Sequence, residues 1–114
     1  MYEQMADRFL TDFELMILLA ILRIGEDAYG VPIAKEIEER AGRTVLLGAI
    51  YAGLDRLEGK GLVTSFHGDP TAVRGGRAKR FFNVTPAGMK AVRQTQRALT
   101  RLWTGVPQLR GSGA

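Results

Sequence analysis

The sequence contains no cysteine and a single histidine, and these shortages exclude several kinds of chemistry. Without cysteine there is no disulfide framework, no thiol nucleophile and no thiolate metal site. His67 alone does not supply a histidine metal centre or a Ser/His/Asp triad, and no Gly-x-x-x-x-Gly-Lys phosphate loop is present. We therefore expect no catalytic residue, no metal and no cofactor, so an enzyme is the least favoured class of function.

Long apolar runs are missing as well. No stretch of about 18 apolar residues occurs, and the polar start of the chain does not resemble a signal peptide, so we expect a cytoplasmic chain. The 114 residues suffice for one domain. A hydrophobic fraction of 46% and a charged fraction of 25% are typical of a folded globular protein.

Acidic residues are absent from the last part of the chain. Residues 1–42 contain 4 Lys/Arg and 9 Asp/Glu, residues 43–69 contain 3 of each, and residues 70–114 contain 9 Lys/Arg and no acidic residue. This separation indicates a polyanionic partner, either nucleic acid or a membrane face, more strongly than the mild net charge of +4 does by itself. A solvated basic helix explains the charge equally well, so other features must decide.

Hydrophobic spacing predicts three helices, a β-hairpin and a last helix. Helix caps, Gly stops and the change from helical to β-type spacing set the boundaries. The expected elements are a helix from Thr11-Asp12 to Ile24, a helix from Val31-Pro32 to Gly42, a helix with core residues Leu47, Ile50, Leu54 and Leu57, strands at 62–66 and 80–84, and a helix from Thr85-Pro86 to about Trp103.

Two of these helices predict a homodimer. The first helix is apolar on nearly all sides, and a chain of this size has too little material to cover both faces, so a partner subunit is the expected second wall. The last helix is amphipathic. Its apolar side carries Val92, Leu99, Leu102, Trp103 and Val106, and its basic side carries Lys90, Arg93, Arg97 and Arg101.

The order of elements predicts a mainly α fold with a small β-hairpin, a winged helix-turn-helix followed by a C-terminal dimerisation helix. We assign residues 1–84 to the DNA-binding domain with its N-terminal helix, 85–107 to the dimerisation helix and 108–114 to a flexible tail. An exposed helix of such a motif enters the major groove, while a basic hairpin holds phosphates or probes the minor groove. Double-stranded DNA is therefore the expected partner, and no membrane contact is expected.

The candidate DNA-binding residues lie on the second and third helices and on the hairpin. They are Lys35, Thr44, Gly48, Ala49, Tyr51, Ala52, Arg56, Arg74, Arg77, Lys79 and Arg80. Tyr51 is expected to contact a phosphate, and a half-buried packing role is its alternative. An ordinary solvated hairpin is the alternative for the basic loop. A winged-helix module that binds protein without DNA is the second function considered, but it has no need of a basic hairpin.

Three stretches of the chain resemble the PadR-like transcriptional regulators. Ala28-Tyr29-Gly30-Val31-Pro32-Ile33 resembles the family's Tyr-Gly entry to the second helix. Residues 48–63, which read GAIYAGLDRLEGKGLV, resemble its recognition helix, and residues 76–88, which read GRAKRFFNVTPAG, resemble its wing and the start of its last helix. Gly53 departs from the family pattern, where Pro or a larger residue is common, and is expected to weaken the third helix by about 1 kcal/mol.

The resemblance implies a homodimeric repressor of the family's short subgroup, whose first and last helices build the dimer. In some short members a hydrophobic pore at that interface takes flat aromatic compounds. By this resemblance Phe13, Ile17, Leu99 and Trp103 are the candidate ligand-binding residues, and an aromatic small molecule is the expected effector. Plain interface packing of Leu99 and Trp103 is the alternative.

Overall fold

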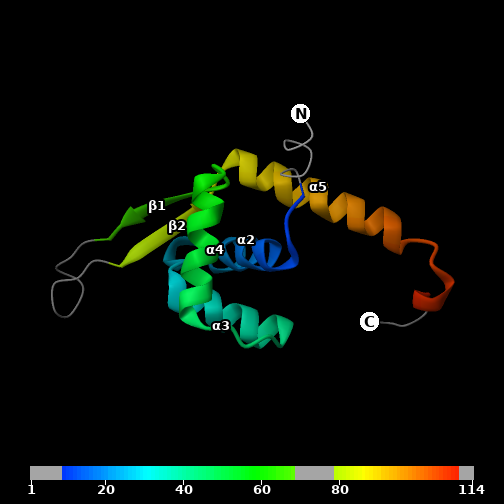
Figure 1. The fold of residues 1–114 in the computed structure, drawn as a ribbon, viewed down its shortest axis with the longest axis horizontal. Coiled ribbons are helices and arrows are strands. Elements are labelled where there is room, and N and C mark those ends of the chain that lie inside the picture. The colour runs from blue at the N-terminus through cyan, green and yellow to red at the C-terminus, as the bar shows by residue number, and fades with distance from the viewer. Residues whose placement is uncertain (1–8, 69–78, 111–114) are drawn as a thin grey trace.

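The computed structural model describes residues 9–68 and 79–110 of the chain. In chain order the elements are α2 (Asp12–Ile24), the 3₁₀ helix η1 (Gly25–Asp27), α3 (Gly30–Ala41), α4 (Leu47–Gly59), β1 (Val63–His67), β2 (Arg80–Val84), α5 (Pro86–Trp103) and the 3₁₀ helix η3 (Pro107–Leu109). Figure 1 shows α2, α3 and α4 packed together, with the hairpin on one side and α5 running out on the other. The expected mainly helical fold with a β-hairpin is confirmed.

Helix α2 contacts α3, α4, α5 and β2, so it lies at the centre of the fold. It begins with a reciprocal pair of caps: the Thr11 hydroxyl accepts a hydrogen bond from the Glu14 N–H at 3.1 Å, and the Glu14 carboxylate accepts one from the Thr11 N–H at 2.9 Å. It ends at Gly25, whose φ of 84° suits a residue without Cβ. Ile17 and Leu18 are completely buried.

An ion pair between a buried glutamate and a partly exposed lysine joins the start of α2 to the end of α4. The Glu14 side chain is only 2% exposed, and its Oε2 lies 2.8 Å from Lys60 Nζ. Burial by itself would raise the pKa of Glu14, but hydrogen bonds from Lys60 and Thr11 outweigh it and hold that pKa below its usual value. Glu14 is therefore a charged group on the buried side of α2, and Lys60 is its counter-ion.

Helices α3 and α4 bury one stripe each against α2. Ile33 on α3 and Ile50 on α4 are both fully buried. A Cβ added to Gly53 would lie 2.6 Å from Cδ1 of Ile17, so this glycine lets α4 approach α2 closely. The expectation that Leu47 belongs to the core stripe is wrong: it is 41% exposed, because it is the first residue of α4 and lies beyond the end of the core.

The two strands form an antiparallel hairpin in which Val63 pairs with Val84 and Ser65 with Phe82. The structure shifts β1 by one residue relative to the expected 62–66. Phe82 is buried, and its N–H donates to the carbonyl of Ala28 at 2.9 Å. This bond joins the hairpin to the segment that precedes α3, which fixes the hairpin beside the three-helix core.

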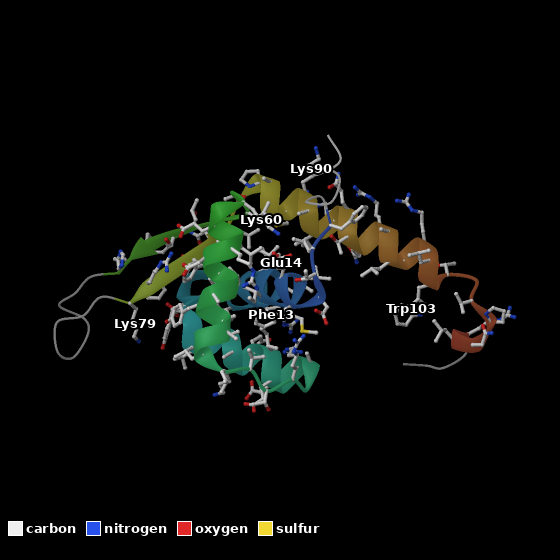
Figure 2. All side chains as sticks on the ribbon, viewed as in Figure 1. Phe13, Glu14, Lys60, Lys79, Lys90 and Trp103 are labelled. Carbon is white, nitrogen blue, oxygen red and sulfur yellow. The ribbon has the colours of Figure 1, made fainter. Side chains whose placement is uncertain are left out.

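Helix α5 is buried only in its first half. The Thr85 hydroxyl accepts a hydrogen bond from the Gly88 N–H at 3.0 Å, as expected for the cap, and Val92 packs into the core. Further along, Leu99, Leu102 and Trp103 are 49%, 75% and 63% exposed. Figure 2 shows Lys90 on the outer side of α5 and Trp103 on the inner side. The expected apolar stripe exists, but most of it is uncovered in a single chain.

Helices long and apolar enough to cross a membrane do not occur in the part of the chain that the structure describes.

Candidate nucleic-acid interface

Helices α3 and α4 and the turn between them form a helix-turn-helix. Gly42 opens the turn in the left-handed conformation, with φ of 68°. Arg43 then ties the turn to α2: its guanidinium lies 3.4 Å from the Asp12 carboxylate and 5.1 Å from the centre of the Phe13 ring. The Thr44 hydroxyl donates to Glu38 at 3.2 Å. The start of α4 is therefore held from two sides, as a helix that inserts into DNA requires.

The outer face of α4 is free of packing within the chain. The candidate residues Gly48, Ala49, Ala52 and Arg56 are all exposed there, and Lys35 is exposed on α3. These side chains are small or basic, so the backbone of α4 is accessible to a groove along much of this face.

Tyr51 is half-buried rather than exposed. Its ring lies against Gly30, where an added Cβ would be 2.5 Å from the ring and from the phenol oxygen. The glycine of the Tyr-Gly sequence at the start of α3 thus makes room for a tyrosine of α4. The ring of Tyr51 thus has the packing role that the sequence offered as an alternative. Its phenol oxygen lies where α4 meets the start of α3.

At the base of the hairpin, Lys79 continues this surface. Its Nζ lies 3.2 Å from the hydroxyl of Tyr29 and 4.4 Å from the centre of the Tyr29 ring. Tyr29 immediately precedes Gly30, on which Tyr51 packs. The hairpin, the start of α3 and the face of α4 are therefore contiguous. Arg74 and Arg77 lie outside the described residues.

Arg80, a further candidate for DNA contact, already has acidic partners within the chain. Its guanidinium lies 3.1 Å from Asp55 Oδ1 and also pairs with Glu58 of α4. Ser65 donates to Glu58 at 2.6 Å; this bond and the pair with Arg80 together keep the pKa of Glu58 below its usual value despite some burial. Through these two carboxylates Arg80 joins the hairpin to α4.

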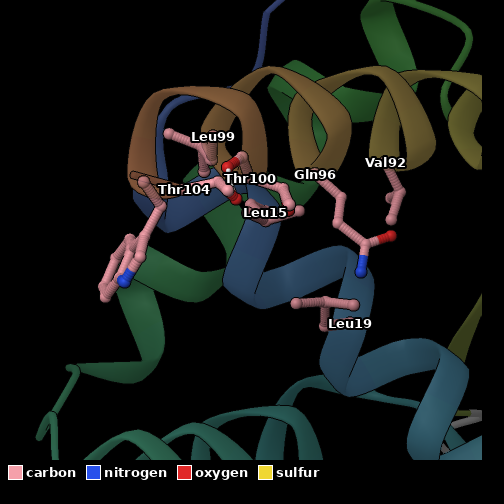
Figure 3. A pocket seen from close by; sticks show the side chains of 8 residues that line it. Leu15, Leu19, Val92, Gln96, Leu99, Thr100 and Thr104 are labelled. Carbon is pink, nitrogen blue, oxygen red and sulfur yellow. Dashed lines mark hydrogen bonds between the residues drawn. The ribbon is translucent and has the colours of Figure 1, made fainter. Parts of the chain in front are cut away.

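A separate pocket of about 380 Å³ opens between α2 and α5 (Figure 3). Apolar and uncharged polar side chains line it: Leu15, Leu19, Val92, Gln96, Leu99, Thr100, Trp103 and Thr104. Two of the four candidate ligand residues, Leu99 and Trp103, are therefore here.

Phe13 and Ile17, the other two candidate ligand residues, do not line this pocket. Both side chains approach Gly53 of α4 instead, and Ile17 is completely buried. The reason is helix geometry: residues two apart are rotated by about 200° around the axis, so Leu15 and Leu19 face α5 when Phe13 and Ile17 face α4. The sequence alone does not distinguish the two sides, since positions 13, 15, 17 and 19 are all apolar.

Within the described residues no group of three or more His, Asp or Glu side chains is arranged to hold a metal ion. His67 is exposed at the end of β1.

Comparison with known proteins identifies the family to which this fold belongs. A profile of the Transcriptional regulator PadR-like family matches residues 18–94, which run from α2 through the hairpin into α5. The chain belongs to the PadR-like family. Among solved structures, the hsRosR-S4 complex matches with a TM-score of 0.66 and 29% identity, over 89% of this chain and 80% of that one. A PadR family transcription regulator from Clostridium difficile R20291 has the same fold, with a TM-score of 0.65 and 24% identity over 81% and 90% of the two chains.

A similar transcriptional regulator from another organism supports the same class. Transcriptional regulator Rv3488 of Mycobacterium tuberculosis is 37% identical over 76 residues, which are 67% of this chain and 66% of that protein. The match thus spans just under two thirds of the relative's length. DNA-binding regulation of transcription is the function that this PadR-like membership supports.

Proposed function

We propose that this PadR-like chain is a homodimeric repressor that binds duplex DNA through α4 and the hairpin, and that a small aromatic molecule bound between α2 and α5 lowers its DNA affinity. One observation carries the DNA part. The free face of α4, the start of α3 and the base of the hairpin are contiguous through Tyr51, Tyr29 and Lys79. A protein-binding module without DNA contact has no need of the basic residues that continue this surface.

The proposal assigns phosphate or minor-groove contacts to Arg74, Arg77 and Lys79 of the hairpin. No acidic residue follows position 69 in the sequence, so these cations have no acidic neighbour along the chain that would neutralise them. Each phosphate contact releases condensed counterions, and the affinity of the complex for DNA therefore falls as salt rises.

Arg77→Ala is expected to weaken binding to every DNA sequence alike and to reduce the slope of log affinity against log salt by about one unit. Mobility shifts with a generic duplex at a series of salt concentrations measure both quantities. Arg93→Ala, which removes an exposed arginine of α5, is the matched control and is expected to leave the slope unchanged. An unchanged slope and affinity in Arg77→Ala would remove the hairpin from the DNA site.

The effector part of the proposal is supported by the pocket between α2 and α5. Its volume of about 380 Å³ is in the range of small-molecule sites, and the exposed indole of Trp103 offers a stacking surface for a planar ring. A dimer reads two half-sites one helical turn apart. A ligand that binds best when the two α4 helices are at a different spacing lowers DNA affinity by shifting that equilibrium.

Calorimetric titration with a panel of aromatic dyes and phenolic acids is expected to detect saturable binding that accompanies quenching of the indole. Trp103→Ala is expected to lose this binding, whereas Leu109→Ala in η3, which is outside the pocket, is expected to keep it. Absence of calorimetric binding across the panel would leave Trp103 as a packing residue, and the DNA part of the proposal would stand.

A further inference from the structure

Leu46 is the most exposed large hydrophobic residue in the described part of the chain. It is 80% exposed, and its neighbour Leu47 is 41% exposed. Both lie at the very start of α4, where Leu46 is the N-cap and Leu47 is the first helical residue. This pair of leucines contributes little to the core.

Leu46 also fails to stabilise its own helix. The N-cap positions of α2 and α5 are Thr11 and Thr85, and each hydroxyl accepts a backbone N–H of the first turn. Ser, Thr, Asp and Asn are preferred there because their side chains satisfy such N–H groups, and leucine is among the least favoured residues. Leu46 makes no such bond. A residue that stabilises neither its helix nor the core is expected at a position that contacts a binding partner.

The chemistry of the major groove indicates which contact fits. The first residues of the second helix in a helix-turn-helix reach the base edges. The first turn of α4 carries only Leu46, Leu47, Gly48 and Ala49, and none of these side chains is a hydrogen-bond donor or acceptor. The hydroxyl of the nearby Thr44 is already bonded to Glu38. In the groove each base pair presents donors and acceptors, but the C5-methyl of thymine is its apolar feature.

We infer that Leu46 and Leu47 contact thymine methyl groups, so that each DNA half-site of this regulator contains thymine where the start of α4 enters the major groove. The inference rests on the proposed DNA-binding function and specifies the base chemistry that it reads. Arg56 lies more than two turns further along α4, so it is expected to contact a phosphate or a more distant base.

The test uses duplexes selected by the full-length protein from a randomised library, in which single thymines are then replaced by deoxyuridine. This replacement removes only the methyl group. Fluorescence anisotropy is expected to show about a fourfold loss of affinity at each contacted thymine, and no loss at other thymines.

Leu46→Ser separates a reading role from a structural one. Serine is a good N-cap, so the midpoint of thermal unfolding is expected to rise by about 4 °C. At the thymine that Leu46 contacts, deoxyuridine replacement is expected to cause no further loss of DNA affinity in this variant. Leu109→Ser, a matched change of a 40% exposed leucine in η3, is expected to keep the discrimination.

Three outcomes overturn the inference. Equal affinity for thymine and deoxyuridine duplexes at every position would do so while leaving the proposed function intact. Discrimination that persists in both Leu46→Ser and Leu47→Ala would assign it to DNA shape. A fall in the unfolding midpoint of Leu46→Ser would make Leu46 a packing residue. Failure of the wild-type protein to bind any duplex would instead overturn the proposed function itself.

Discussion

Leu102→Glu is expected to separate the proposed dimer and to lower DNA affinity about 100-fold or more. Leu102 is 75% exposed in the single chain and lies beside Leu99 and Trp103 on the uncovered half of α5. A carboxylate there would have to be buried without a partner in the dimer, which strongly disfavours association. Two linked half-sites bind far more tightly than one, because the second contact is intramolecular, so the separated chain loses that advantage.

Sedimentation at micromolar concentration measures the first effect. The wild type is expected at twice the 12.5 kDa mass of one chain, and the variant at that mass. Gln108→Glu introduces the same charge at an exposed position of η3, outside α5, and is the matched control. A wild-type chain that sediments as a stable monomer, or a Leu102→Glu variant that stays dimeric, would contradict the assignment of α5 to dimerisation.

Lys60→Met is expected to lower the free energy of unfolding by about 3 kcal/mol at neutral pH. The substitution keeps the length of the side chain but removes the ammonium that lies 2.8 Å from the buried Glu14 carboxylate. A charge left without its partner inside a protein costs far more than the pair contributes, because its desolvation is no longer offset. Urea unfolding at matched protein concentrations measures the change, since dimer stability depends on concentration.

The pH dependence of this effect has a definite sign. In the wild type the pKa of Glu14 is below its reference of 4.5, so the stability that Glu14 contributes is complete above that pH and is lost as pH falls through the lowered pKa. In Lys60→Met burial dominates and raises that pKa, so the penalty of the unpaired carboxylate is relieved as pH falls. The difference between the two proteins is therefore expected to shrink on acidification.

Lys60→Arg keeps a cation at this position and is the control for side-chain packing. It is expected to stay within about 1 kcal/mol of the wild type at neutral pH. A Lys60→Met protein as stable as the wild type, or a gap between the two that widens on acidification, would show that Glu14 does not depend on Lys60 for its charge.

The helix boundaries were predictable because local chemistry sets them. Thr11 and Thr85 are caps by their own hydroxyls, Gly25 and Gly42 end helices by their positive φ, and Pro86 fits the first turn of α5. None of these features depends on residues far away in the sequence, so a pattern along the chain suffices to find them.

The role of the individual charges was not predictable, because it depends on contacts distant in the chain. Arg80 belongs to a basic stretch in the sequence, yet Asp55 and Glu58, more than 20 residues away, neutralise it. Glu14 interrupts an apolar run, which signals that it needs a partner, but 46 residues separate it from Lys60. Periodicity identifies such a residue as unusual without identifying its counter-ion.

The rotation of α2 about its own axis also escaped prediction. A helix that is apolar on all sides gives no indication of which side faces which neighbour, so the sequence does not show that Leu15 and Leu19 line the pocket while Phe13 and Ile17 approach α4. The amphipathic α5 did not share this ambiguity, since its arginines mark the side in water.

The same division of α2 has an evolutionary consequence. Leu15 and Leu19 face the pocket, while Phe13 and Ile17 set the distance to α4 through Gly53. Under the proposed function these are two separate tasks that use different residues. Substitutions at 15 and 19 would then change the proposed effector site without altering α4, and substitutions in the first turn of α4 would change the proposed DNA contacts without altering the pocket. Descendants of one duplicated gene would thus be free to acquire new effectors and new target promoters in separate steps.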